Sequence, residues 1–202
     1  MSGNRKRIKM PQGNILRGLF RLIQGDQNGL REFGNSPRAF SASLAPLIAF
    51  PLVGSALFAL SGHLILALVM LLSRVAAVLL QPVITEFVAG RSNSSTTWLM
   101  TSTALNWSVW LVFPLIFLGV LIANGLVTTG FSDYNAVVIA ACLIAAYYTW
   151  LQWFILRIGL RLHWLYALLL VLGMNILIGG ISYLPYEIHP DLLTLTLHPA
   201  AK

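Results

Sequence analysis

The chain has 202 residues, of which 57% are hydrophobic and only 9% are charged, and its formal net charge is +7. An ordinary soluble domain carries about 25% charged residues, and a disordered chain contains few hydrophobic residues, so the composition excludes both classes. It predicts an all-α, polytopic membrane protein. The single cysteine, Cys142, excludes a disulfide within the chain.

Residues 1–38 form a basic segment that we expect to face the cytoplasm. Within it, apolar residues recur on one face of a helix, and these residues are Ile15, Leu16, Leu19, Phe20 and Ile23. Arg17 and Arg21 lie on the other flank. The pattern predicts an N-terminal amphipathic helix in the membrane interface, where both arginines contact anionic lipid headgroups. The alternative is a helix docked on the end of the transmembrane helices.

Five apolar segments follow, and each has the length of about 20 residues that a membrane span needs. The first two cover residues 40–60 and 64–84, with a Ser-Gly-His turn between them. Ser36 followed by Pro37 is typical of an N-cap and the first helical position. No cleavable signal peptide is expected, because the first apolar run is too long for one.

Polar residues mark the boundaries of the later spans. Residues 92–97 are serine, threonine and asparagine and predict a loop. Asn124-Gly125 predicts the end of the third span, and Pro185 the end of the fifth. The three remaining spans are therefore predicted over residues 99 or 104 to 123, 135–156 and 163–184.

The basic residues predict the orientation. Eleven of the 13 lie before the first span or in the loops after the second and fourth: Arg5, Lys6, Arg7, Lys9, Arg17, Arg21, Arg31, Arg38, Arg91, Arg157 and Arg161. Because cytoplasmic loops are enriched in Lys and Arg, we expect a cytoplasmic N-terminus. Residues 39–184 then form a five-helix transmembrane bundle, and residues 185–202 a short tail on the far side of the membrane.

Arg74 lies about ten residues into the second span, near the middle of the bilayer. A charge at that depth costs roughly 2.5–3.5 kcal/mol on insertion scales, and no carboxylate lies at the same depth. Asn175, near the midpoint of the fifth span, is the best intramembrane partner. Two interpretations remain: an anion or lipid-headgroup contact inside the bundle, or a structural arginine satisfied by Asn175, carbonyls and a water. More convergent polar groups would favour the first.

Aromatic and basic residues alternate between the fourth and fifth spans. They are Trp150, Trp153, Arg157, Arg161 and Trp164. This pattern is typical of an anchoring belt at the cytoplasmic interface, and a lipid-headgroup site is the alternative.

The residue types of most catalytic sites are missing from the predicted spans. No histidine pair suits haem, no cluster suits a metal, and no carboxylate suits a proton relay. We therefore expect no cofactor, no metal and no enzymatic activity. The bilayer and its anionic headgroups are the expected partners rather than nucleic acid, since anionic lipid lies beside the basic segment. A membrane-protein partner or a second copy of the chain is also possible.

Several motifs resemble a known family. They are LREF at residues 30–33, SPRAFSASL at residues 36–44, Pro51, NWS at residues 106–108 and Pro114. With the aromatic fourth helix, they resemble five-helix inner-membrane proteins of alphaproteobacteria in the Yip1-like superfamily. The resemblance implies a bacterial inner-membrane bundle with a cytoplasmic N-terminus and a periplasmic C-terminus. It implies no established activity.

Three functions remain open. The first is a scaffold or accessory subunit that binds a membrane partner or anionic lipid. The second is a small transporter or channel subunit with Arg74 and Asn175 in an anion pathway, and the third is an enzyme acting on lipid or quinone. A cavity that reaches Arg74 would favour the second, and a dry core with an apolar groove open to lipid would favour the first.

Overall fold

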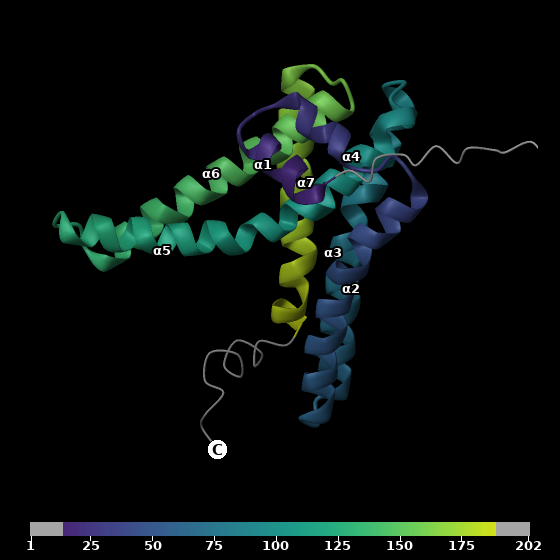
Figure 1. Cartoon of the computed structure of the whole chain (residues 1–202). Helices are drawn as coiled ribbons and strands as arrows, with labels where there is room; N and C mark the ends of the chain where they lie inside the picture. The colour runs from purple at the N-terminus through teal and green to yellow at the C-terminus, as the bar shows by residue number, and fades with distance from the viewer. Residues whose placement is uncertain (1–13, 189–202) are drawn as a thin grey trace, which may run out of the picture.

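A computed structural model describes residues 14–188 (Figure 1), and all regular secondary structure in this range is helical. The helices are α1 (Ile15–Ile23), α2 (Pro37–Leu60), α3 (Leu64–Arg91), α4 (Ser95–Ser108), α5 (Val112–Thr128), α6 (Asp133–Gly159) and α7 (Trp164–Ile188). Two 3-10 helices are η1 (Gln27–Glu32) and η2 (Val109–Leu111). The basic residues 5–9 and residues 189–202 of the predicted tail lie outside the described residues.

Five helical segments are long and apolar enough to cross a membrane. Four of them are α2, α3, α6 and α7, and the fifth runs from Ser95 to Thr128 through α4, η2 and α5. This confirms the all-α fold class and the predicted number of long apolar helices. The chain therefore has the helices of a multi-pass membrane protein.

The predicted start of α2 agrees with the structure, whereas several predicted helix ends do not. The side chain of Ser36 accepts a hydrogen bond from the Ala39 backbone N–H at 3.2 Å, and Pro37 begins α2, as predicted. However, α3 continues to Arg91, α5 to Thr128 and α7 to Ile188, so the predicted ends at residues 84, 123 and 184 are wrong. Among apolar surroundings a helix pairs its own backbone groups, and this favours continuing past a Gly or Pro.

The predicted loop over residues 92–97 is confirmed for residues 92–94 and wrong for residues 95–97, because α4 begins at Ser95. Two hydroxyl groups explain the early start. Ser94 Oγ donates to the carbonyl of Leu160 at 2.8 Å, and Thr97 Oγ1 donates to the carbonyl of Gly159 at 2.7 Å. These hydroxyls therefore satisfy carbonyls at the end of α6 that lack partners within the helix.

The long helices form two groups that meet at one end (Figure 1). Helices α2, α3 and α7 pack side by side, while α5 pairs with α6 in a hairpin that points in another direction. Helix α4 contacts α2, α3 and α6 at the junction, and α1 and η1 pack against it. We call the assembly of α1, η1, α4 and the turn between α6 and α7 the head.

Polar residues form much of the buried centre of the head. Residues 101–106 of α4 are all buried, although three of them carry a hydroxyl group. Thr101 donates to the carbonyl of Thr97 at 2.8 Å, and Thr103 donates to the carbonyl of Leu99 at 2.6 Å. Because these hydroxyls are paired within the helix, α4 can be buried despite its many polar residues.

Helix α1 packs closely on η1 through two glycines. A Cβ atom at Gly18 would lie 2.8 Å from Phe33 Cε2 and 3.1 Å from the Gly29 carbonyl oxygen. A Cβ atom at Gly29 would lie 2.8 Å from the Gly18 carbonyl oxygen. Only glycine at both positions allows this approach of the two backbones.

The apolar residues of α1 face two ways. Leu19 and Leu22 are buried in the head, whereas Leu16 is 77% and Phe20 is 63% exposed. The buried pair fits the alternative in which the helix docks on the other helices. The exposed pair is available to lipid, and a place in the membrane interface stays a prediction.

Candidate functional site

A cleft with a mainly apolar lining and several polar side chains lies between the two groups of long helices. It has a volume of about 320 Å³ and is lined by residues of α2, α3, α4, η2, α5, α6 and α7. Its polar lining residues are Arg74, Gln81, Asn106, Tyr148, Gln152, Asn175 and Ser182. We call it the central cleft. Polar groups at membrane depth typically mark functional sites, so this is the candidate site.

One face of α3 forms a wall of the central cleft. Arg74, Ala77, Val78 and Gln81 all line it, and their spacing of three, four and seven residues places them on one side of the helix. Gln81 is only 7% exposed, and its Nε2 atom has no hydrogen-bond partner. A buried donor left unpaired costs about 1–3 kcal/mol. Gln81 therefore holds a buried, unpaired donor at the wall of the cleft.

Arg74 lines the central cleft and is an exposed residue. Within residues 14–188 the structure records no ion pair or hydrogen bond for its side chain. The nearest carboxylate along α3 is that of Glu86, about 18 Å away at 1.5 Å per residue. The guanidinium group therefore has no anionic partner from its own helix.

Asn175 lines the same cleft as Arg74 but is paired elsewhere. Its Nδ2 atom donates to Gln152 Oε1 at 2.9 Å. Asn106 is also paired, since its Nδ2 atom donates to Ser43 Oγ at 2.9 Å and joins α4 to α2. Both hydrogen bonds join neighbouring helices. Among the arginine, asparagine and glutamine side chains that line the cleft in the described range, Arg74 and Gln81 are the two without a recorded hydrogen bond.

Sequence reasoning missed Gln81 altogether. The available indication was its position seven residues after Arg74, which is two helical turns along the same face. No such spacing could connect Arg74 with residues of α6 and α7. Only the packing of α3 against α7, and of α6 against α7, brings those residues to one cleft.

An apolar groove lies beside the central cleft along the α5–α6 hairpin. It has a volume of about 380 Å³, and Val112 and Tyr148 line both cavities. Its other lining residues are small or aliphatic, including Gly119, Ala123 and Ala140. The central cleft and the apolar groove are therefore neighbours.

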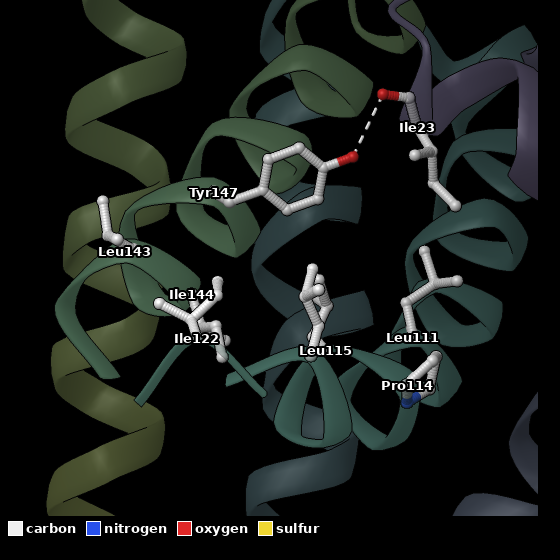
Figure 2. A pocket seen from close by; sticks show the side chains of 9 residues that line it. Ile23, Leu111, Pro114, Leu115, Ile122, Leu143, Ile144 and Tyr147 are labelled. Carbon is white, nitrogen blue, oxygen red and sulfur yellow. Dashed lines mark hydrogen bonds between the residues drawn. The ribbon is translucent and has the colours of Figure 1, made fainter. Parts of the chain in front are cut away.

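A second apolar pocket lies on the hairpin near the head (Figure 2). It has a volume of about 400 Å³ and is lined by side chains such as Leu115 and Ile144. The hydroxyl of Tyr147 donates to the backbone carbonyl of Ile23 at 3.0 Å, which ties α6 to the end of α1. Since that hydroxyl is already bonded, the pocket suits hydrocarbon rather than a polar ligand.

The predicted aromatic and basic belt lies at the corner between α6 and α7. Trp153 Nε1 donates to the carbonyl of Trp164 at 2.9 Å, and the Arg157 guanidinium carbon lies 5.2 Å from the centroid of the Trp153 ring. The ring of Trp150 stacks on that of Phe154, one turn further along α6, with centroids 5.6 Å apart. Arg161 lies in the following turn with a φ of 52°. The tryptophans make packing contacts, and their role as a membrane belt stays a prediction.

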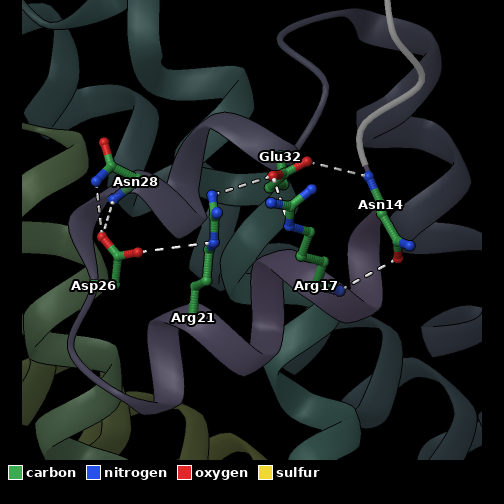
Figure 3. Close-up of polar contacts among 6 residues, drawn as sticks. All are labelled: Asn14, Arg17, Arg21, Asp26, Asn28 and Glu32. Atoms are coloured by element: carbon green, nitrogen blue, oxygen red, sulfur yellow. Dashed lines mark hydrogen bonds and ion pairs between the residues drawn. The ribbon is translucent and has the colours of Figure 1, made fainter.

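Arg17 and Arg21 face carboxylates of the adjoining segment (Figure 3). Arg21 Nη1 donates to Glu32 Oε1 at 3.3 Å, and Arg21 Nε lies 3.8 Å from Asp26 Oδ2. Arg17 Nε lies 3.7 Å from Glu32 Oε1. Exposed pairs of this kind contribute at most about 1 kcal/mol. They leave less free charge for lipid headgroups than the sequence alone indicates.

The part of the chain that the structure describes contains no group of side chains suited to a metal ion. Within residues 14–188, no three His, Cys, Asp or Glu residues are grouped so that they could hold a metal ion. The only cysteine, Cys142, is exposed on α6. The donors of the central cleft favour binding of an acceptor rather than coordination of a cation.

Comparison with known proteins yields no relative. The chain matches no family model, no curated protein and no solved structure. The resemblance to the Yip1-like superfamily therefore stays a prediction, and the function rests on the geometry of the chain itself.

Proposed function

We propose that this chain is a non-catalytic, multi-pass protein of the bacterial inner membrane that binds an anionic group in the central cleft. One observation carries the proposal: Arg74 and the buried Gln81 Nε2 atom are donors without recorded partners on one face of α3. A guanidinium group and an amide N–H together suit a carboxylate or phosphate oxygen. Five further polar residues line the same cleft, and this supports a binding site.

The headgroup of an anionic lipid is the source of the anion that we favour. The central cleft adjoins the apolar groove along α5 and α6, since Val112 and Tyr148 line both. A lipid could place its headgroup in the polar part and an acyl chain in the groove. A free anion would use the cleft alone and leave the groove without a function.

The protein would then act as an accessory or scaffold subunit rather than an enzyme. Helix α5 packs against α6 and η2, and Phe113, Ile116, Phe117 and Val120 are all at least 54% exposed. Lipid, a partner protein or a second copy of the chain could cover this surface. Purification in a mild detergent, followed by identification of co-purifying proteins and lipids, tests this role. A protein that emerges alone and without lipid would contradict it.

The binding proposal is tested by comparing Arg74→Gln with Arg91→Gln. Both substitutions remove one positive charge from α3, but Arg91 lies at the helix end, over the Phe87 ring at 3.9 Å, outside the central cleft. The full chain would be reconstituted into nanodiscs of phosphatidylcholine and phosphatidylglycerol, and retained phosphatidylglycerol would be counted by native mass spectrometry. We expect at least about a tenfold loss of affinity for Arg74→Gln and little change for Arg91→Gln. Equal retention by all three proteins would contradict the proposal.

A second candidate is an anion pathway, because Arg74 lines a cleft that residues of several helices form. Proteoliposomes containing an iodide-sensitive dye would distinguish the two functions. Iodide entry that requires Arg74 would identify a free anion as the ligand. Phosphatidylglycerol retention without iodide entry would identify the lipid headgroup.

A further inference from the structure

A smaller polar cavity lies in the head, separate from the central cleft. It has a volume of about 230 Å³ and lies between η1, α4 and the end of α6. Its polar lining residues are Gln27, Asn28, Arg31, Thr97 and Arg161. No carboxylate side chain lines it. Two arginines that are 130 residues apart in the sequence thus share one small cavity.

Arg31 of η1 lines the cavity, whereas Glu32 of η1 contacts Arg21 of α1. A 3-10 helix has three residues per turn, so residues three apart lie on the same face. Asn28 and Arg31 line the cavity from one face of η1, and Gln27 and Leu30 line it from the next face. Gly29 and Glu32 form the face toward α1, where Glu32 accepts a hydrogen bond from Arg21 at 3.3 Å. The nearby carboxylate is therefore engaged on the other side of η1.

Arg161 supplies the left-handed backbone position of the turn that ends α6, but its side chain takes no part in that cap. The Leu162 N–H donates to the Arg157 carbonyl at 3.2 Å across this turn, and Arg161 has a φ of 52°. Glycine is the usual residue at this position of a helix end and would adopt the conformation without strain. Within residues 14–188 the structure records no hydrogen bond or ion pair for the Arg161 side chain. The backbone turn therefore does not account for an arginine here.

We propose that Arg31 and Arg161 bind a phosphate group in this cavity. The planar guanidinium group of arginine matches the oxygen atoms of phosphate, and the structure records no ion pair for either residue within residues 14–188. The cavity is smaller than the range of about 300–1,000 Å³ typical of drug-sized ligands, which favours a single phosphate group. This site does not depend on the function proposed for the central cleft.

A soluble phosphate and a phospholipid headgroup share this chemistry, and two probes separate them. The first is inorganic phosphate, titrated calorimetrically into the full chain in mild detergent at constant ionic strength. The second is phosphatidic acid in phosphatidylcholine nanodiscs, counted by native mass spectrometry. Saturable binding of inorganic phosphate indicates a soluble ligand, and binding of phosphatidic acid alone indicates a lipid headgroup.

Two substitutions remove the proposed contacts, and one serves as a control. Arg31→Gln and Arg161→Gly should each weaken binding about tenfold or more. Arg157→Gln removes the same charge four residues before Arg161, but Arg157 does not line the cavity, so its affinity should stay within about twofold of the unmodified protein. An equal loss in all three variants, or no saturable binding of either probe, would overturn the proposal.

Thermal stability separates binding from a purely structural role. Arg161→Gly removes the side chain at a position where glycine is favoured. Its unfolding midpoint without phosphate should equal or exceed that of the unmodified protein, while its affinity for phosphate falls. A lower midpoint with unchanged affinity would show that Arg161 is structural and would overturn the proposal.

Discussion

Replacing Gly159 with valine should loosen the contact that holds α4 against α6. A Cβ atom at Gly159 would lie 2.6 Å from Thr101 Cγ2 and 2.9 Å from Thr101 Cβ. Thr101 is fully buried and donates to the carbonyl of Thr97 at 2.8 Å. Rotation of the Thr101 side chain would break this hydrogen bond. We therefore expect α4 and α6 to move apart to make room for the valine.

The expected cost follows from these contacts. Overpacking a close contact costs about 1–3 kcal/mol, and loss of the Thr101 hydrogen bond would add about 1 kcal/mol. We expect Gly159→Val to lower the free energy of unfolding by about 2–4 kcal/mol. For a chain of this size, the loss corresponds to a fall of about 4–16 °C in the unfolding midpoint.

Thermal unfolding of the purified chain in mild detergent, followed by circular dichroism, measures the change. Gly173→Val in α7 is the matched control, because nothing lies within 4 Å of a Cβ atom at that glycine. It should change stability by no more than about 0.5 kcal/mol. Adding Thr101→Ala to Gly159→Val should recover part of the loss. Equal effects of Gly159→Val and Gly173→Val would refute the reasoning.

Two further predictions concern the head and the central cleft. Gly18→Val would bring its Cβ atom 3.1 Å from the backbone carbonyl oxygen of Gly29, so α1 should separate from η1 and its amides should exchange hydrogen faster. Asn175→Leu would leave Gln152 Oε1 without its 2.9 Å bond in a residue only 4% exposed, and should cost about 1 kcal/mol of stability. Asn124→Leu, at an exposed position on α5, should show no such loss in the same unfolding assay.

The number and approximate positions of the spans could be predicted because they depend on local composition. Long apolar runs and the Ser36-Pro37 start are both visible along the chain. The ends of the spans could not be placed as well, because a helix in apolar surroundings continues wherever its backbone bonds are favourable. The early start of α4 depends on carbonyls at the end of α6, more than 60 residues away.

The candidate site could be predicted only in part. Arg74 was identifiable from its cost at membrane depth, and Asn175 as a polar residue in another span. Their place on one cleft depends on the packing of α3, α6 and α7. The pairing of Asn175 with Gln152, rather than with Arg74, depends on the relative rotation of α6 and α7. No sequence pattern encodes that rotation directly.

Cysteine accessibility tests most directly whether the central cleft admits an anion at Arg74. In a Cys142→Ser background, Val78→Cys places a thiol on the wall of the cleft, while Leu72→Cys places one at a position that is 61% exposed and does not line it. In nanodiscs, an anionic methanethiosulfonate reagent should modify Val78→Cys and not Leu72→Cys. Adding Arg74→Gln should slow that reaction at least about threefold without slowing a cationic reagent. If Val78→Cys is as unreactive as Leu72→Cys, the cleft is closed to anions and the proposed function is wrong.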